Sequence, residues 1–180
     1  HHKNWNYSLR FNFTKYELQK IMALRINNGL VFYAGNCPFQ TNNEQKDDLR
    51  FFETKNINMV VNLLPREETP MISYDFYKNF FTSKKITVAH FPIKDRSVPD
   101  RNSTKLLSIL LSEISCRIEQ KHNIFIHCHA GLGRTGLLSA LILTKFGLNS
   151  KNAIDVVRNL REGSIETIEQ ENFVLNYFNS

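Results

Sequence analysis

The sequence between residues 126 and 136 reads Ile126-His127-Cys128-His129-Ala130-Gly131-Leu132-Gly133-Arg134-Thr135-Gly136. A short apolar run over 123–127 leads into it, and a longer run over 134–146, apolar on almost every side, follows. The first run has the length of a buried strand and the second that of a buried helix. Glycines between them let the backbone turn sharply without a steric penalty on a Cβ atom. The stretch therefore predicts a strand that enters a central helix through a tight loop.

The rest of the chain alternates in the same way. Strands are expected over 30–34, 58–64 and 86–91, and helices over 44–55, 74–81, from near 102 onward, 150–162 and 167–178. Such alternation predicts a single α/β domain, with a central, mostly parallel sheet of about four to five strands flanked by helices. We expect residues 13–180 to form it, and residues 1–12 to be an N-terminal extension or the remnant of an expression tag.

The loop has the composition of an anion-binding site. Its N–H groups can point inward at the start of a helix, where the helix dipole places partial positive charge. Arg134 lies one turn further on, and its planar guanidinium can hold two phosphoryl oxygens at once. The same field favours the thiolate form of Cys128, which is the nucleophilic form, and Thr135 can donate a hydrogen bond to that sulfur. The expected substrate-binding residues are His129, Ala130, Gly131, Leu132, Gly133 and Arg134.

The order His127-Cys128, five further residues and Arg134-Thr135 resembles the active-site loop of the protein tyrosine and dual-specificity phosphatases. The segments 58–64, 91–99 and 163–173 resemble the same superfamily, with the nearest likeness to the compact group that includes the cyclin-dependent-kinase-associated phosphatases. The resemblance implies a cysteine-phosphatase fold and a phosphoric monoester hydrolase that forms a phosphocysteine intermediate without a cofactor. It also implies phosphotyrosine, and phosphoserine and phosphothreonine as well, as substrates.

In that family an aspartate on an upstream loop protonates the leaving oxygen. Asp95, in the sequence Phe-Pro-Ile-Lys-Asp, occupies the matching place, so the resemblance implies that Asp95 is the catalytic acid. Asp100 is the alternative. Because Asp100 stands just before Asn102 and Ser103, it can instead cap the start of a helix.

The segment 165–170 resembles the part of the family that positions the hydrolytic water. Tyrosine-specific members have two glutamines there, whereas this sequence keeps Gln170 and has Glu166 at the place of the first. Thr167 and Gln170 also match a capping box. Gln170 is therefore expected to support the reaction, the start of a helix, or both.

Two histidines stand beside Cys128. His127 is expected to brace the loop through hydrogen bonds, and His129 to line its mouth. Because these ligands have no second pair nearby in the sequence, we expect no metal site. Cys37 and Cys116 are expected to be small packing residues.

The composition is compatible with an anionic partner without selecting one. The chain has 180 residues with 23 Lys and Arg against 17 Asp and Glu, a net charge of +6. Three cysteines without a disulfide pattern favour the cytoplasm or another reducing intracellular compartment. No apolar run approaches the roughly 18 residues of a membrane span. We expect a monomer that acts on phosphorylated proteins and forms no stable complex with nucleic acid.

Two other functions are compatible with the sequence. A phosphatase of a non-protein substrate, such as a phosphoinositide or an RNA 5′-phosphate, is favoured by the positive charge. Against it, phosphoinositide-acting relatives place lysines inside the loop, where this chain has His129 and Leu132. A phosphate-binding module without catalysis is disfavoured because Cys128, Arg134 and a candidate acid are all present.

Overall fold

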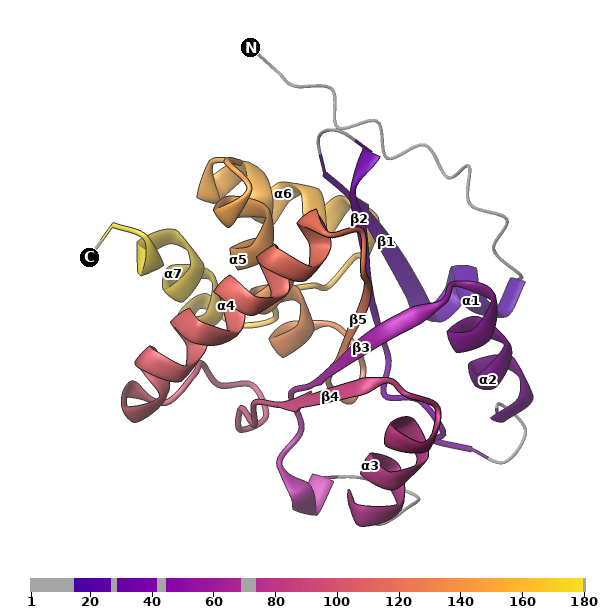
Figure 1. The fold of residues 1–180 in the computed structure, drawn as a ribbon. Helices are drawn as coiled ribbons and strands as arrows, with labels where there is room; N and C mark the ends of the chain where they lie inside the picture. The colour runs from indigo at the N-terminus through magenta and orange to yellow at the C-terminus, as the bar shows by residue number, and fades with distance from the viewer. Residues whose placement is uncertain (1–14, 27–28, 42–44, 69–73, 180) are drawn as a thin grey trace.

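The computed structural model describes residues 15–26, 29–41, 45–68 and 74–179, so the expected extension over 1–12 lies outside the described residues. A five-stranded sheet separates two groups of helices (Figure 1). Helices α4 to α7 lie on one side of the sheet and α1 to α3 on the other. The predicted α/β architecture is therefore confirmed.

The sheet has the strand order β1-β2-β5-β3-β4. The strands are β1 (Ile21–Arg25), β2 (Val31–Gly35), β3 (Ile57–Asn62), β4 (Thr87–His90) and β5 (Asn123–His127). All neighbours are parallel except β1 and β2, which are antiparallel. Strand β5 lies at the centre, between β2 and β3, so the chain leaves it in the middle of the carboxyl edge. The mostly parallel sheet is confirmed.

The predicted helices form within a few residues of their expected limits. They are α2 (Gln45–Thr54), α3 (Tyr74–Ser83), α4 (Thr104–Glu119), α5 (Gly133–Lys145), α6 (Ser150–Leu160) and α7 (Ile168–Tyr177). The helix expected near residue 102 starts as a short 3₁₀ turn, η4 (Arg101–Ser103), before α4. A second 3₁₀ turn, η3 (Arg66–Glu68), follows β3. The sequence did not predict β1 or the short helix α1 (Lys15–Lys20).

Each face of the sheet has its own core, because successive side chains of a strand point to opposite faces. Ile124 and Ile126 of β5 belong to the larger, mainly aliphatic core with the buried residues of α4 to α7. Phe125 belongs to a second, aromatic core with residues of α2 and α3, among them Phe52 and Phe81. Helix α5 is buried from Gly133 to Leu143, as expected for the central helix. Both ends of the strand-to-helix loop are thus fixed in packed structure.

Candidate active site

The loop between β5 and α5 places Cys128 directly after the strand, with its side chain buried. Gly131 has a φ of 71°, and a Cβ atom at this residue would lie 2.4 Å from the backbone carbonyl of Gly35. Only glycine allows this approach. The loop therefore packs against the end of β2, and the predicted tight turn is confirmed.

The carbonyl groups in the first half of the loop are bound by other elements. The carbonyl of His129 accepts hydrogen bonds from the Cys37 N–H, at 3.0 Å, and from Gln40 Nε2, at 2.9 Å. The carbonyl of Ala130 accepts one from Arg161 Nη2, at 2.9 Å. No sequence pattern predicted these contacts of Gln40 and Arg161, which come from distant parts of the chain.

The second half is held in the same way. The carbonyl of Leu132 accepts from the N–H groups of Gly136, at 3.0 Å, and of Ile165, at 3.1 Å. These contacts use the carbonyl groups of the loop and fix its backbone in place. The N–H groups of such a loop are the ones that can form an anion nest.

His127 is fully buried and bound at both ring nitrogens. Nδ1 donates to the carbonyl of Cys128 at 3.1 Å, and Nε2 accepts from the hydroxyl of Tyr77 at 2.5 Å. Burial lowers the pKa of His127 to about 4, which the hydrogen bond to Cys128 offsets only in part. The neutral ring therefore braces the backbone of Cys128 from the aromatic core.

This arrangement makes stability depend on pH. Below the unfolded pKa of about 6.5 the unfolded chain protonates His127, whereas the folded chain does so only near pH 4. Between these values the unfolded state binds more protons, so the free energy of unfolding falls as the pH falls. We expect His127 to contribute a loss of about 3 kcal/mol over this window. Urea denaturation at several pH values measures it.

A matched pair of variants isolates the contribution of His127. His127→Asn should lower stability at neutral pH but flatten the pH dependence between 6.5 and 4. His129→Asn, which changes the exposed neighbour, should leave the slope as it is. An unchanged slope in His127→Asn would mean that another group causes the pH dependence.

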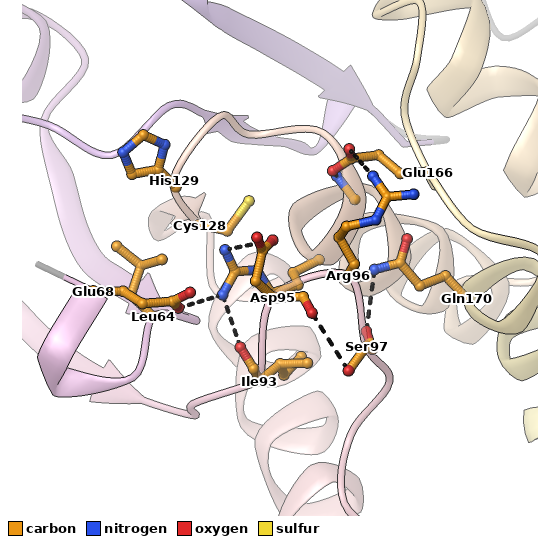
Figure 2. Close-up of polar contacts among 12 residues, drawn as sticks. Leu64, Glu68, Ile93, Asp95, Arg96, Ser97, Cys128, His129, Glu166 and Gln170 are labelled. Atoms are coloured by element: carbon orange, nitrogen blue, oxygen red, sulfur yellow. Dashed lines mark hydrogen bonds and ion pairs between the residues drawn. The ribbon is translucent and has the colours of Figure 1, made fainter.

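Arg134 is the cation at the base of the loop, and it is only 3% exposed. Nη1 donates to Glu68 Oε2 at 2.6 Å and to the carbonyl of Ile93 at 2.8 Å, while Nη2 lies 3.3 Å from Asp95 Oδ1. In Figure 2 the dashed lines from Glu68, Ile93 and Asp95 meet at one unlabelled guanidinium group, which these contacts identify as that of Arg134. The paired Glu68 keeps a buried charge neutralised and the guanidinium plane fixed.

Sequence reasoning missed Glu68. It lies in η3, just after β3, and β3 is the direct neighbour of β5 in the sheet. Residues that follow adjacent parallel strands meet at the same edge. A carboxylate just beyond the 58–64 strand was the signal that could have found it.

The two candidate acids have different surroundings. Asp95 lies beside Arg134, although its side chain is 61% exposed. Asp100 is turned into η4, where Oδ1 accepts a hydrogen bond from the Asn102 N–H at 3.0 Å. The structure therefore brings Asp95 to the site and uses Asp100 as a helix cap.

Gln170 ties the loop that carries Asp95 to α7. Its Nε2 donates to the carbonyl of Ser97 at 3.1 Å, and its Oε1 completes the predicted capping box with Thr167. The carbonyl of Ile93 is held by Arg134, so the loop is fixed on both sides of Asp95. Gln170 is fully buried. It also lies next to the start of α5, because a Cβ atom on Gly133 would be 3.0 Å from Gln170 Oε1.

The remaining predicted residues are placed as follows. His129 is exposed at the mouth of the loop. Thr135 is fully buried, but its Oγ1 has no hydrogen-bond partner within the described part of the chain, so the expected bond to Cys128 is not formed.

Burial raises the pKa of Cys37 to about 12, so this thiol is neutral and packs in the core as expected. Cys116 is exposed on α4, and the prediction of a packing role was wrong.

Two negative findings concern only part of the chain. Among the residues that the structure describes, no group of three His, Cys, Asp or Glu side chains is arranged to hold a metal ion. None of the helices formed by these residues is long and apolar enough to cross a membrane.

Solved structures share this fold. The kinase associated phosphatase, with serine in place of its catalytic cysteine, matches with a TM-score of 0.70 and 21% identity over 85% of this chain and 88% of that one. PTPMT1 matches with a TM-score of 0.68 and 14% identity over 82% of this chain and 90% of that one. The chain therefore has the fold of these phosphatases.

The family of the chain follows from its sequence, which a family model matches. The model of the family described as "Polymorphic toxin system, DSP-PTPase phosphatase" matches residues 34–148. The chain therefore belongs to this phosphatase family, whose members are phosphoric monoester hydrolases. Cyclin-dependent kinase inhibitor 3 of Sus scrofa is 34% identical over 92 residues, which are 49% of this chain and 42% of that protein. The chain spans about half the length of the curated relatives it matches.

Proposed function

We propose that this protein is a cysteine-dependent protein phosphatase that hydrolyses phosphotyrosine, and also phosphoserine and phosphothreonine. The observation that carries the proposal is the meeting of Cys128, Arg134 and Asp95 at one anion-binding loop. The buried thiol begins the loop, the guanidinium ends it, and the carboxylate lies 3.3 Å from the guanidinium. This set contains a nucleophile, a group that binds phosphoryl oxygens and a proton donor.

In the first step of the proposed reaction, a phosphoryl group binds to the N–H groups of the loop and to Arg134. The Cys128 thiolate attacks phosphorus, and the bond from phosphorus to the ester oxygen breaks. Asp95 donates its proton to that oxygen, so that the product leaves as a neutral alcohol or phenol. Arg134 and the N–H groups stabilise the charge that develops on the transferred group.

In the second step, a water molecule attacks the phosphorus of the phosphocysteine. Asp95, now a carboxylate, takes a proton from this water, the sulfur–phosphorus bond breaks, and the electron pair returns to Cys128 as thiolate. Inorganic phosphate is left in the loop. Because the reaction needs a free thiolate, we also propose that the protein works in a reducing compartment.

The exposure of the acid supports dual specificity. Asp95 contacts Arg134 and is still 61% exposed, so little depth separates the guanidinium from solvent. A shallow site accepts the short side chains of phosphoserine and phosphothreonine as well as the longer phosphotyrosine. We therefore expect phosphate release from all three kinds of phosphopeptide.

A second candidate is a phosphatase of non-protein phosphate esters. The net charge of +6 favours an anionic substrate, and PTPMT1, which shares the fold, was solved in complex with PI(5)P. Phosphate release from phosphopeptides, PI(5)P and a 5′-phosphorylated RNA, measured side by side at equal concentration, tests the proposal. If the lipid or the RNA is hydrolysed and no phosphopeptide is, the substrate is that lipid or RNA and not a phosphorylated protein.

Replacing the acid gives a large and diagnostic loss. Asp95→Asn should lower kcat for a phosphotyrosine peptide about 10²-fold or more, because the leaving oxygen departs without a proton. The loss should shrink for a dinitrophenyl phosphate, whose leaving group is stable as an anion. Steady-state kinetics with both substrates measure the difference.

Asp100→Asn is the matched control. Asparagine keeps a side-chain oxygen that can accept from the Asn102 N–H, and it caps helices as well as aspartate does. We expect kinetics close to those of the wild type. If Asp100→Asn loses activity and Asp95→Asn keeps it, the role of acid passes to Asp100.

A further inference from the structure

A carboxylate of the protein itself is bound at the phosphate loop. Glu166 Oε1 accepts a hydrogen bond from the Gly133 N–H at 3.1 Å, and Glu166 Oε2 lies 3.5 Å from Arg96 Nη1 (Figure 2). Gly133 is the first residue of α5, and the N–H groups in the first turn of a helix have no acceptor within the helix. Glu166 thus takes one of the donors that the loop offers to a phosphoryl oxygen.

The backbone holds Glu166 in this place. The preceding residue, Ile165, has a φ of 57°, which is unfavourable for a β-branched side chain. Its N–H donates to the carbonyl of Leu132, and its carbonyl accepts from Arg158 Nη2 at 3.0 Å. A strained conformation persists when its surroundings impose it, and such residues gather at functional sites.

The loop is shaped to receive the carboxylate. A Cβ atom on Gly133 would lie 2.6 Å from Glu166 Oε1, so any other residue here would push the carboxylate away. Its other oxygen is held only loosely, because Arg96 is 63% exposed and the ion pair is long. Glu166 is therefore close enough to bind Gly133 and free enough to leave it.

We propose that Glu166 is an internal competitor for the phosphate-binding loop. A phosphoryl oxygen and Glu166 compete for the Gly133 N–H, and two anions this close repel each other. Substrate binding displaces the carboxylate toward Arg96, and its return after hydrolysis helps to expel inorganic phosphate. The inference rests on the proposed function, because Glu166 would control how tightly phosphate binds at that same site.

Direct binding of inorganic phosphate tests the inference without any turnover. Calorimetric titration of the wild type and of Glu166→Gln should show about tenfold tighter binding in the variant, because glutamine has the same shape without the charge. Glu166→Ala, which removes the group, should show a similar gain and serves if the glutamine variant does not fold. Glu169→Gln removes an equal charge from an exposed neighbour in α7, and its affinity should equal that of the wild type.

The outcomes separate this inference from the proposed function. Equal or weaker phosphate binding in both Glu166 variants would overturn the inference, whether or not the enzyme turns over phosphopeptides. An equal gain in Glu169→Gln would also overturn it, because the effect would then come from net charge alone. If no phosphate ester is hydrolysed but the Glu166 variants still gain affinity, the proposed function fails and the competition stands.

Discussion

The Cys128→Ser variant is expected to release no measurable phosphate from any substrate, while it still binds phosphate. A serine hydroxyl is a far weaker nucleophile than a thiolate, and no neighbouring base is proposed to activate it. Losing a covalent nucleophile lowers kcat by on the order of 10⁴-fold or more. The N–H groups of the loop and Arg134 are unchanged, so calorimetry should still detect phosphate. Phosphate release under single-turnover conditions measures the loss.

Cys116→Ser is the control for this variant. It makes the same atomic change at an exposed cysteine on α4, away from the loop, and should have wild-type activity. Mass spectrometry of the acid-quenched wild type should also find a phosphoryl adduct that Cys128→Ser lacks. Retention of a few per cent of the wild-type rate by Cys128→Ser would rule out a phosphocysteine intermediate.

The centre of the site was predictable because its parts are contiguous in the chain. The strand that ends at His127, the glycine-containing turn and the helix that begins near Arg134 follow from residues 123–146 alone. Local patterns predict such a unit, because the period of the apolar residues, the positions of the glycines and the length of each apolar run can all be read from neighbouring residues. The same reasoning holds for the capping box of Thr167 and Gln170.

The partners of these residues were not predicted, because the fold brings them from distant parts of the chain. Tyr77 on α3 meets His127, Glu68 after β3 meets Arg134, and Arg161 after α6 holds the loop carbonyl of Ala130. None of them belongs to a local pattern. Only the strand order, which places β3 beside β5, indicates that Glu68 is near.

The failure to predict β1 and the wrong prediction for Cys116 have a common cause. In β1 every second residue is only partly buried. Two of these partly buried residues, Ile21 and Ala23, are apolar, so the alternation of apolar and polar residues that predicts a strand is weak. Cys116 lies at the edge of the buried stripe of α4, where a small shift of register decides between core and solvent. Sequence patterns predict that an element exists better than they predict the surroundings of a residue at its margin.

Arg134 connects the catalytic parts of the site. Its Nη1 binds Glu68 and the carbonyl of Ile93, and its Nη2 binds the carboxylate of Asp95. It therefore orients the loop of the acid and also supplies positive charge to the phosphoryl group. A lysine at this position offers one nitrogen, which cannot reach all of these acceptors and grip two phosphoryl oxygens as well.

Arg134→Lys should therefore lower kcat/KM by about 10³-fold or more, since interactions that strengthen in the transition state are lost. Phosphate affinity should fall with it. Arg117→Lys, which changes a surface arginine paired with Glu113 on α4, is the matched control and should keep wild-type kinetics. Steady-state kinetics and phosphate titration of both variants measure the difference. Near-wild-type values for Arg134→Lys would show that its guanidinium does not face the phosphoryl group, and Arg161, which binds the loop at Ala130, would become the cation to test.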